Sequence, residues 1–167
     1  MKFHYKVREG EETLQYVNVM SLYPYVCKYF KFPVGRPVIH EGEACQDREN
    51  MLQKEGLIKS CIIPPQRPQH PGLPYRCNGR LILCLCRSCS IEYNRDGECA
   101  HETVEEKALT GTWVIDEVRK AVQKGYEIVE MIEVYEYAVT QYDSLTGEGG
   151  LFVEYIDTFL KLKMEAS

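Results

Sequence analysis

The chain has 167 residues, of which 44% are hydrophobic and 27% charged, a balance that permits one packed globular domain. The net charge of −5 argues against a strongly basic nucleic-acid module. No apolar run is long enough for a membrane span, and the polar N-terminus lacks the apolar core of a signal peptide. We therefore expect an intracellular protein, without distinguishing nucleus from cytoplasm.

The first predicted elements are a short strand over 13–19 and a helix over 21–30. The strand is predicted from alternating residues, and the hydroxyl of Ser21 is expected to cap the helix. A loop is predicted next, because helix-breaking residues follow: Pro33, Gly35 and Pro37.

The middle of the chain predicts a helix around 48–54 and a β-branched strand over 57–65. Residues 64–76 hold five of the eight prolines, so this segment is predicted to be an extended loop outside any sheet interior. The apolar run over 80–86 predicts another strand.

In the last third, a helix is predicted over 110–125, with Thr112 as its cap and Gly125 as its left-handed stop. Residues 126–139 are aromatic and β-branched and indicate a strand, although glutamates at every third position leave a helix as the alternative. Residues 151–164 predict an amphipathic helix with an apolar face made of Leu151, Tyr155, Phe159 and Leu162.

Strands and helices that alternate without regular βαβ spacing indicate an α+β fold with mixed or antiparallel strands and flanking helices. We expect a single domain over 1–167, built from a strand-turn-helix at 13–40, strands and a proline-rich loop at 57–83, a small zinc lobe at 84–102, and a helix-strand-helix unit at 110–164.

The zinc lobe is predicted from the spacing of its cysteines. Cys86 and Cys89 form a C-x-x-C pair that can clasp one ion, and Cys99 with His101 forms a second close pair. Cys84 is a possible substitute ligand, although strand alternation favours the core for it. Four protein ligands leave no open position, so the zinc would be structural. The alternative is a set of buried, reduced cysteines.

A motif that carries chemistry lies at the first predicted strand-helix junction. The run from Asn18 to Pro24, N-V-M-S-L-Y-P, resembles the D-x-x-S-L-Y-P motif of family B DNA polymerases. The wider run Y-V-N-V-M-S-L-Y-P-Y-V-C-K-Y-F-K-F-P-V-G is similar to the protein-primed branch of that family. Segments downstream, including L-P-Y-R-C-N-G-R-L-I-L-C-L-C and L-T-G-T-W-V-I-D-E-V, resemble the polymerases of Maverick/Polinton-type transposons.

The resemblance implies part of a polymerase palm that acts on DNA primer–template and dNTPs with Mg²⁺. It implies that Ser21 and Leu22 face the triphosphate and that Tyr23 rejects a 2′-hydroxyl. Asn18 stands where the family places a metal-binding aspartate, and a neutral amide is a poorer magnesium ligand than a carboxylate.

The family motifs K-x-x-x-N-S-x-x-G and Y-x-D-T-D-S do not occur in the 167 residues. We therefore expect a fragment or truncated copy that does not polymerise alone. The alternative is a non-catalytic, zinc-stabilised module, derived from a polymerase, that binds DNA or a protein partner or the missing polymerase segments. Without the companion segments, the same motif would be explained by a capped junction with Leu22 and Tyr23 in the core.

Other residues give weaker predictions. Trp113 is expected to anchor its helix in the core, and the glutamates over 127–136 are expected to form an exposed acidic face. Three histidines are expected at the surface: His4, His40 and His70. Basic side chains of the first half could contact phosphates, with a solvated surface as the default: Lys28, Lys31, Arg36, Arg67, Arg76, Arg80 and Arg87.

Overall fold

The computed structural model describes residues 21–66, 71–94 and 99–166, together with isolated positions between 8 and 19. The chain divides into two compact units, one made of 1–31 with 141–167 and the other of 32–140. Each unit is described by itself. The predicted strand at 13–19 and the residues Asn18, His4 and His70 lie outside the described residues or only partly within them.

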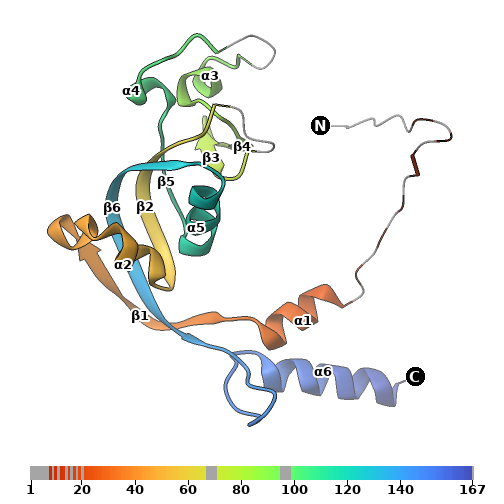
Figure 1. The fold of residues 1–167 in the computed structure, drawn as a ribbon. Helices are drawn as coiled ribbons and strands as arrows, with labels where there is room; N and C mark the ends of the chain where they lie inside the picture. Colours follow the sequence, from red (N-terminus) through yellow and green to blue (C-terminus); the bar gives the residue numbers. More distant parts are fainter. Residues whose placement is uncertain are drawn as a thin grey trace. The chain divides into compact units, whose positions relative to one another are not determined.

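The unit of 32–140 is built on a four-stranded sheet in the order β1-β6-β2-β5 (Figure 1). Every pairing in this sheet is antiparallel, which confirms the predicted α+β class. Its strands are β1 (Phe32–Glu41), β2 (Gly56–Ile63), β5 (Leu109–Val114) and β6 (Glu127–Thr140).

Helices and a hairpin connect these strands. Between β1 and β2 lie the 3₁₀ turn η1 (Gly42–Gln46) and α2 (Arg48–Gln53), and α5 (Ile115–Gln123) lies between β5 and β6. Between β2 and β5, the chain forms the hairpin β3 (Pro74–Cys77) and β4 (Arg80–Leu83), then α3 (Arg87–Ile91) and α4 (Val104–Lys107).

The core lies on one face of the sheet, where α5 packs. Alternate residues of β2 point into it, and Ile58 and Ile62 are fully buried. The neighbouring strands add Trp113, opposite Ile58 on β5, and Val134, opposite Ile58 on β6. The core position predicted for Trp113 is confirmed, and its indole Nε1 donates a hydrogen bond to the Pro74 carbonyl at 2.7 Å.

The helix predicted to start at Thr112 was wrong in its first turn. Residues 109–114 form β5, and α5 begins only at Ile115, where the Val114 N–H donates to the Glu117 carboxylate at 3.3 Å. Pairing with β2 outweighs the preference of Thr112 for a helix start, because the strand conformation buries Trp113. The stop at Gly125 agrees with its φ of 91°.

The predicted loop at Pro33, Gly35 and Pro37 was also wrong. This segment belongs to β1, which lies at the edge of the sheet, where prolines need no ladder partner on the open side. The register shifts between Val34 and Val38, so that the residues between them bulge away from regular pairing with β6. Residues 74–77, predicted as loop, similarly pair only within the two-stranded β3–β4 sheet.

The predicted exposed acidic face of β6 is found at Glu127 and Glu130, which are exposed, but not at Glu133 and Glu136, which are half-buried. Glu136 is half-buried and accepts bonds from Lys54 at 3.0 Å and from His40 at 2.7 Å. Glu133 is bonded by Lys59 at 2.9 Å and by the Tyr135 hydroxyl. His40 is therefore a half-buried partner of the sheet, because pairing of β1 with β6 brings it beside Glu136.

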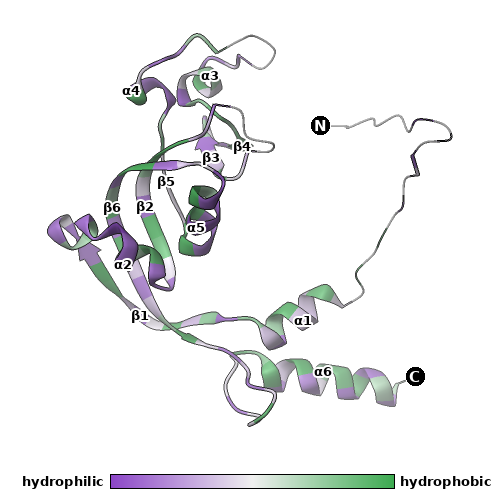
Figure 2. Cartoon of the chain, viewed as in Figure 1, coloured by the Kyte–Doolittle hydropathy of each residue, from purple (hydrophilic) through white to green (hydrophobic). Residues whose placement is uncertain are grey.

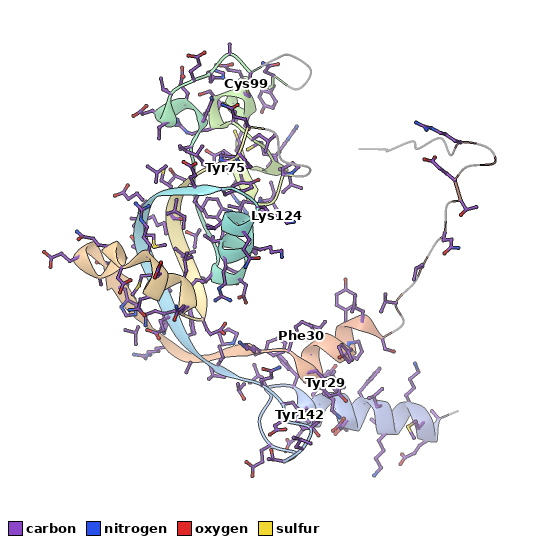
Figure 3. The ribbon with its side chains drawn as sticks, in the orientation of Figure 1. Tyr29, Phe30, Tyr75, Cys99, Lys124 and Tyr142 are labelled. Carbon is purple, nitrogen blue, oxygen red and sulfur yellow. The ribbon has the colours of Figure 1, made fainter. Side chains whose placement is uncertain are left out.

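The unit formed by the two chain ends contains α1 (Leu22–Tyr29) and α6 (Val153–Glu165). Lys28 Nζ contacts Asp157 Oδ1 at 2.5 Å. The ring centroids of Tyr29 and Tyr142, both labelled in Figure 3, lie 5.8 Å apart. The predicted helix at 151–164 is confirmed, and hydrophobic and hydrophilic bands alternate along it (Figure 2). Ile156 is buried, whereas four side chains of the predicted apolar face are more than half exposed: Leu151, Tyr155, Phe159 and Leu162.

Truncation of the central core residue Ile58 tests the sheet. We expect Ile58→Ala to lower the free energy of unfolding by about 2–5 kcal/mol, because it opens a cavity at a fully buried position. The matched variant Ile39→Ala, on β1 at 53% exposure, should cost less than about 1 kcal/mol. Urea unfolding followed by circular dichroism measures both, and equal costs would contradict the described core.

The bonds to Glu136 predict a pH dependence. Hydrogen bonds from Lys54 and from His40 lower the pKa of Glu136 from its ordinary 4.5. Because the folded-state pKa is the lower one, this stabilisation is present above about pH 4.5 and is lost as the pH falls through the folded pKa. Glu136→Gln should therefore lower the unfolding temperature at pH 7, and the two proteins should converge under acid. Glu127→Gln, at an exposed position of β6, serves as the control and should match the wild type at pH 7.

Candidate functional site

The S-L-Y-P turn is exposed at the start of α1. Ser21 precedes the helix in the left-handed conformation, with a φ of 58°. Its side chain makes no cap hydrogen bond, so the predicted hydroxyl cap was wrong, since this backbone conformation differs from the extended one of a usual N-cap. Leu22 is 47% exposed and Tyr23 is 85% exposed. Neither side chain is therefore buried in the core, although the alternative explanation of this motif requires such burial.

Contacts at the C-terminal end of α1 fix this helix within its unit. Besides the Lys28–Asp157 pair, Gln141 Nε2 donates to the Tyr29 carbonyl at 3.0 Å. The ion pair with Asp157 raises the pKa of Lys28, so this lysine is charged at neutral pH. These contacts leave the N-terminal turn of the helix open, because they all lie one or two turns away from it.

The magnesium site implied by the resemblance is not assembled by the described residues. Asn18 lies outside them, and within the described ranges one group of three or more potential metal ligands is found, which is composed of cysteines and a histidine. Thiolate and imidazole do not suit Mg²⁺, which prefers oxygen ligands. No catalytic step through magnesium is therefore derived from this structure.

The predicted cysteine and histidine ligands do come together. Sγ of Cys86, Cys89 and Cys99 and a ring nitrogen of His101 all lie within 4.8 Å of one another, and we call this group the Cys₃His cluster. Nδ1 of His101 lies 3.6, 3.4 and 3.7 Å from the three sulfur atoms in chain order. Cys84 is not part of this group, and it packs half-buried against the core as expected.

Local structure explains how the four side chains meet. Cys86 is the residue before α3 and Cys89 lies within it, so one helical turn brings their sulfur atoms to the same side. Cys99 and His101 precede α4, whose first turn is fixed by a reciprocal cap between Thr103 and Glu106. The label of Cys99 in Figure 3 marks the lobe where α3 and α4 lie side by side.

The electrostatics of the Cys₃His cluster favour a bound cation. Contact with the His101 ring lowers the pKa of Cys99 to about 7. Burial, followed by the neighbouring thiols Cys99 and Cys86, raises the pKa of Cys89 to about 12. Burial and the neighbouring thiols therefore oppose ionisation of Cys89. A divalent ion held by the cluster would offset this opposition.

One participant was missed by the sequence reasoning. Glu92 Oε1 lies 3.4 Å from Nε2 of His101, the ring nitrogen that faces away from the sulfur atoms. Nothing in the sequence marks this glutamate among its neighbours, because the contact depends on how the end of α3 folds against the segment before α4.

The predicted basic residues belong to both units of the chain. Lys28 is paired with Asp157, and Arg67 lies outside the described residues. Arg76 and Arg80 are exposed on the β3–β4 hairpin, and Arg87 is exposed at the start of α3. The sequence therefore located exposed cations, but the described structure assigns them no common ligand.

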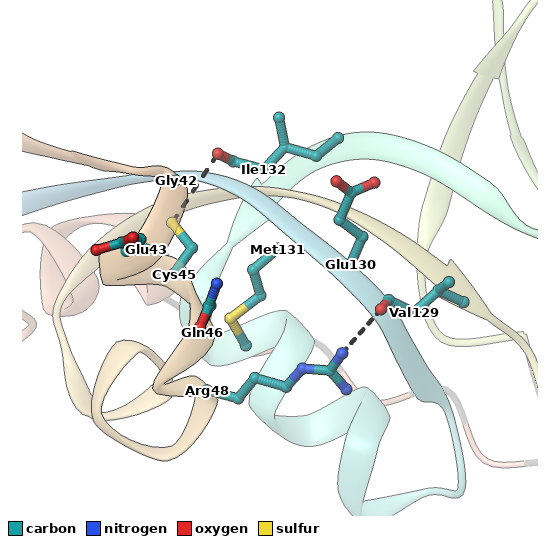
Figure 4. A pocket seen from close by; sticks show the side chains of 9 residues that line it. All are labelled: Gly42, Glu43, Cys45, Gln46, Arg48, Val129, Glu130, Met131 and Ile132. Carbon is teal, nitrogen blue, oxygen red and sulfur yellow. Dashed lines mark hydrogen bonds between the residues drawn. The ribbon is translucent and has the colours of Figure 1, made fainter.

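A pocket between η1 and β6 is lined by nine residues (Figure 4): Gly42, Glu43, Cys45, Gln46, Arg48, Val129, Glu130, Met131 and Ile132. Its arginine, Arg48, donates to the carbonyls of Ile128 and Val129 at 2.7 and 2.8 Å, so its charge is used in fixing α2 to the sheet. Cys45 is buried beside it, and its thiol donates to the His40 carbonyl at 3.3 Å. This pocket carries no group of predicted catalytic residues.

Comparison with known proteins identifies the family. The family model for DNA polymerase type B, organellar and viral, matches residues 3–167. The chain therefore belongs to the family B DNA polymerases of organellar and viral type. No curated protein and no solved structure matches the chain significantly. Among the described helices, none has the length and apolar character required to cross a membrane.

Proposed function

We propose that this chain forms part of the palm region of a protein-primed family B DNA polymerase and provides the edge that receives the incoming dNTP. The observation that supports this most directly is the exposed Ser21–Leu22–Tyr23 turn in a chain matched by the polymerase family over nearly its full length. The protein-primed, transposon-type branch is proposed on the wider Y-x-N-V-x-S-L-Y-P and P-V-G runs in the sequence.

The chemistry of the turn fits a nucleotide. Backbone N–H groups at a helix start have no helical partner and can donate to phosphate oxygens. Tyr23, in the first turn of α1, presents a flat ring that can pack below a deoxyribose and exclude a 2′-hydroxyl by its bulk. Primer–template DNA is the proposed partner of the surrounding surface, with affinity that falls as salt rises.

We further propose that the 167-residue chain does not polymerise by itself. Asn18 replaces a metal-binding carboxylate, and a two-metal mechanism depends on anionic ligands that hold both ions. Templated incorporation of dNTPs by the purified chain with Mg²⁺ would contradict this part of the proposal.

Replacement of Tyr23 tests the sugar gate. We expect wild-type chain to bind dNTP in preference to NTP, and Tyr23→Ala to reduce that preference by about tenfold, because the 2′-hydroxyl no longer meets the ring. Fluorescence titration with matched dNTP and NTP analogues measures the ratio. Tyr155→Ala removes a ring of similar exposure from α6 and should leave the ratio unchanged. Absence of nucleotide binding, or equal effects of the two variants, would contradict the proposal.

Replacement of Asn18 tests the metal position. With Mg²⁺ present, Asn18→Asp should tighten dNTP binding by roughly tenfold, because a carboxylate attracts the ion that accompanies the triphosphate. With EDTA the same variant should bind dNTP more weakly than wild type, since two negative groups then face each other. The same titration, run in both buffers, measures this reversal. Equal effects in the two buffers would place Asn18 away from the triphosphate.

A further inference from the structure

We propose that the Cys₃His cluster binds one structural zinc ion through three thiolates and Nδ1 of His101, and that Glu92 positions the histidine ring. This site lies in the lobe between β4 and β5, and the proposal does not depend on the polymerase activity of the chain.

The distances from the sulfur atoms to Nδ1 of His101 match those of a tetrahedral zinc site. Zn–S bonds of about 2.3 Å and Zn–N bonds of about 2.05 Å at tetrahedral angles place sulfur and nitrogen ligands about 3.6 Å apart. The three observed Sγ–Nδ1 distances are 3.6, 3.4 and 3.7 Å. The widest separation within the cluster is under 4.8 Å, against about 3.8 Å for an ideal pair of sulfur ligands, so an ion would draw the sulfur atoms together by up to about 1 Å.

The donor set selects zinc among common ions. Three thiolates and one imidazole are soft and borderline ligands, which exclude magnesium and calcium, and four of them complete a closed tetrahedral shell. Because no position is left for water or substrate, the ion would stabilise the lobe and would not take part in catalysis. Cys86 is 4% exposed, so its thiolate would be shielded from water on one side of the ion.

Glu92 completes the site from outside. Its carboxylate lies 3.4 Å from Nε2 of His101, so an N–H at Nε2 points toward it while Nδ1 is free for the ion. A carboxylate behind a metal-bound histidine fixes the ring and increases its basicity. The observed arrangement of sulfur atoms on one ring nitrogen and a carboxylate on the other is that of such a pair.

The ion would clamp two segments that are already joined by hydrogen bonds between α3 and α4, one of them from Arg87 Nη1 to the Glu105 carbonyl at 3.5 Å. Ser88 Oγ donates to the Glu106 carbonyl at 3.0 Å, and Cys86 Sγ lies 3.6 Å from the same oxygen. From α4 the chain passes through the buried residues Ala108 and Leu109 into β5. Zinc would therefore hold the α3–α4 lobe and fix the point at which β5 enters the core.

The first experiment measures metal content and coordination of the whole chain. We expect about one zinc per chain by mass spectrometry, and a Co²⁺-substituted form with thiolate charge-transfer and intense tetrahedral d–d absorption. Cys89→Ser and Cys99→Ser should lose at least 90% of the bound zinc, whereas Cys84→Ser should keep it. Chelation should lower the unfolding temperature of wild type by about 5 °C or more, because binding energy contributes to folding.

The second experiment tests Glu92 with a variant that leaves every ligand in place. Glu92→Gln should retain the tetrahedral cobalt spectrum but weaken zinc binding by about tenfold in a competition with a chromophoric chelator. Glu102→Gln, an exposed glutamate of the same lobe, is the control and should bind zinc as wild type does.

Three results would overturn the zinc site: a metal-free chain that gives no thiolate–cobalt band, a stoichiometric metal other than zinc, and equal loss of metal in Cys84→Ser and Cys89→Ser. Equal zinc affinity of the Glu92 and Glu102 variants would overturn the positioning role proposed for Glu92.

Discussion

The pairing of β2 with both β5 and β6 is the constraint on which the larger unit depends. β2 is an inner strand, and its alternate residues Ile58 and Ile62 are fully buried between the sheet and α5. Since a shift of one residue would turn these side chains to the other face, the buried pattern specifies the register. This register sets where β5 begins, and therefore where α4 and the ligands before it are held.

The Cys₃His cluster and the sheet consequently support each other. Among the described residues of the lobe, none belongs to the buried core cluster of the sheet, and the helices α3 and α4 have five and four residues. Helices this short are unstable by themselves, because formation of the first turn costs more than its hydrogen bonds return. Capping at Thr103 stabilises α4, and the proposed zinc ion would add a link between the two helices. Ala108 and Leu109, which are both buried, connect α4 directly to the start of β5.

Several elements could be predicted because they depend on neighbouring residues, whereas others are determined by contacts with residues distant in the chain. The β-branched run that forms β2, the stop at Gly125 and the two ligand pairs could be recognised from the local sequence alone. The start of α5 could not, because residues 110–114 carry both helix-capping and β-branched residues, and only the neighbouring strand β2 decides between them. Gly111 contributes to the same outcome: a Cβ there would come within 2.8 Å of the Trp113 ring, so its absence makes room for the indole.

Partners contributed by other segments were also invisible in the sequence. His40 and Lys54 meet Glu136 only because β1 and the end of α2 lie against β6, and Glu92 meets His101 only after the lobe has folded. Prolines misled the prediction for β1, since a bulge at the edge of a sheet accommodates them. These partners are contacts distant in sequence, which local preferences do not reveal.

The S-L-Y-P turn combines features that packing alone does not explain. A serine in the left-handed conformation costs of order 1 kcal/mol or more, and neither Leu22 nor Tyr23 beside it is buried in the core. α1 contains no buried residue, so the strain is not compensated within the helix. Backbone strain of this kind is concentrated where a ligand is bound. Asn18, in the proposed metal position, is neutral, whereas a two-metal mechanism depends on anionic ligands. If the proposed roles of the turn and of Asn18 both hold, nucleotide binding and nucleotidyl transfer are separable in this chain, and each requires its own measurement.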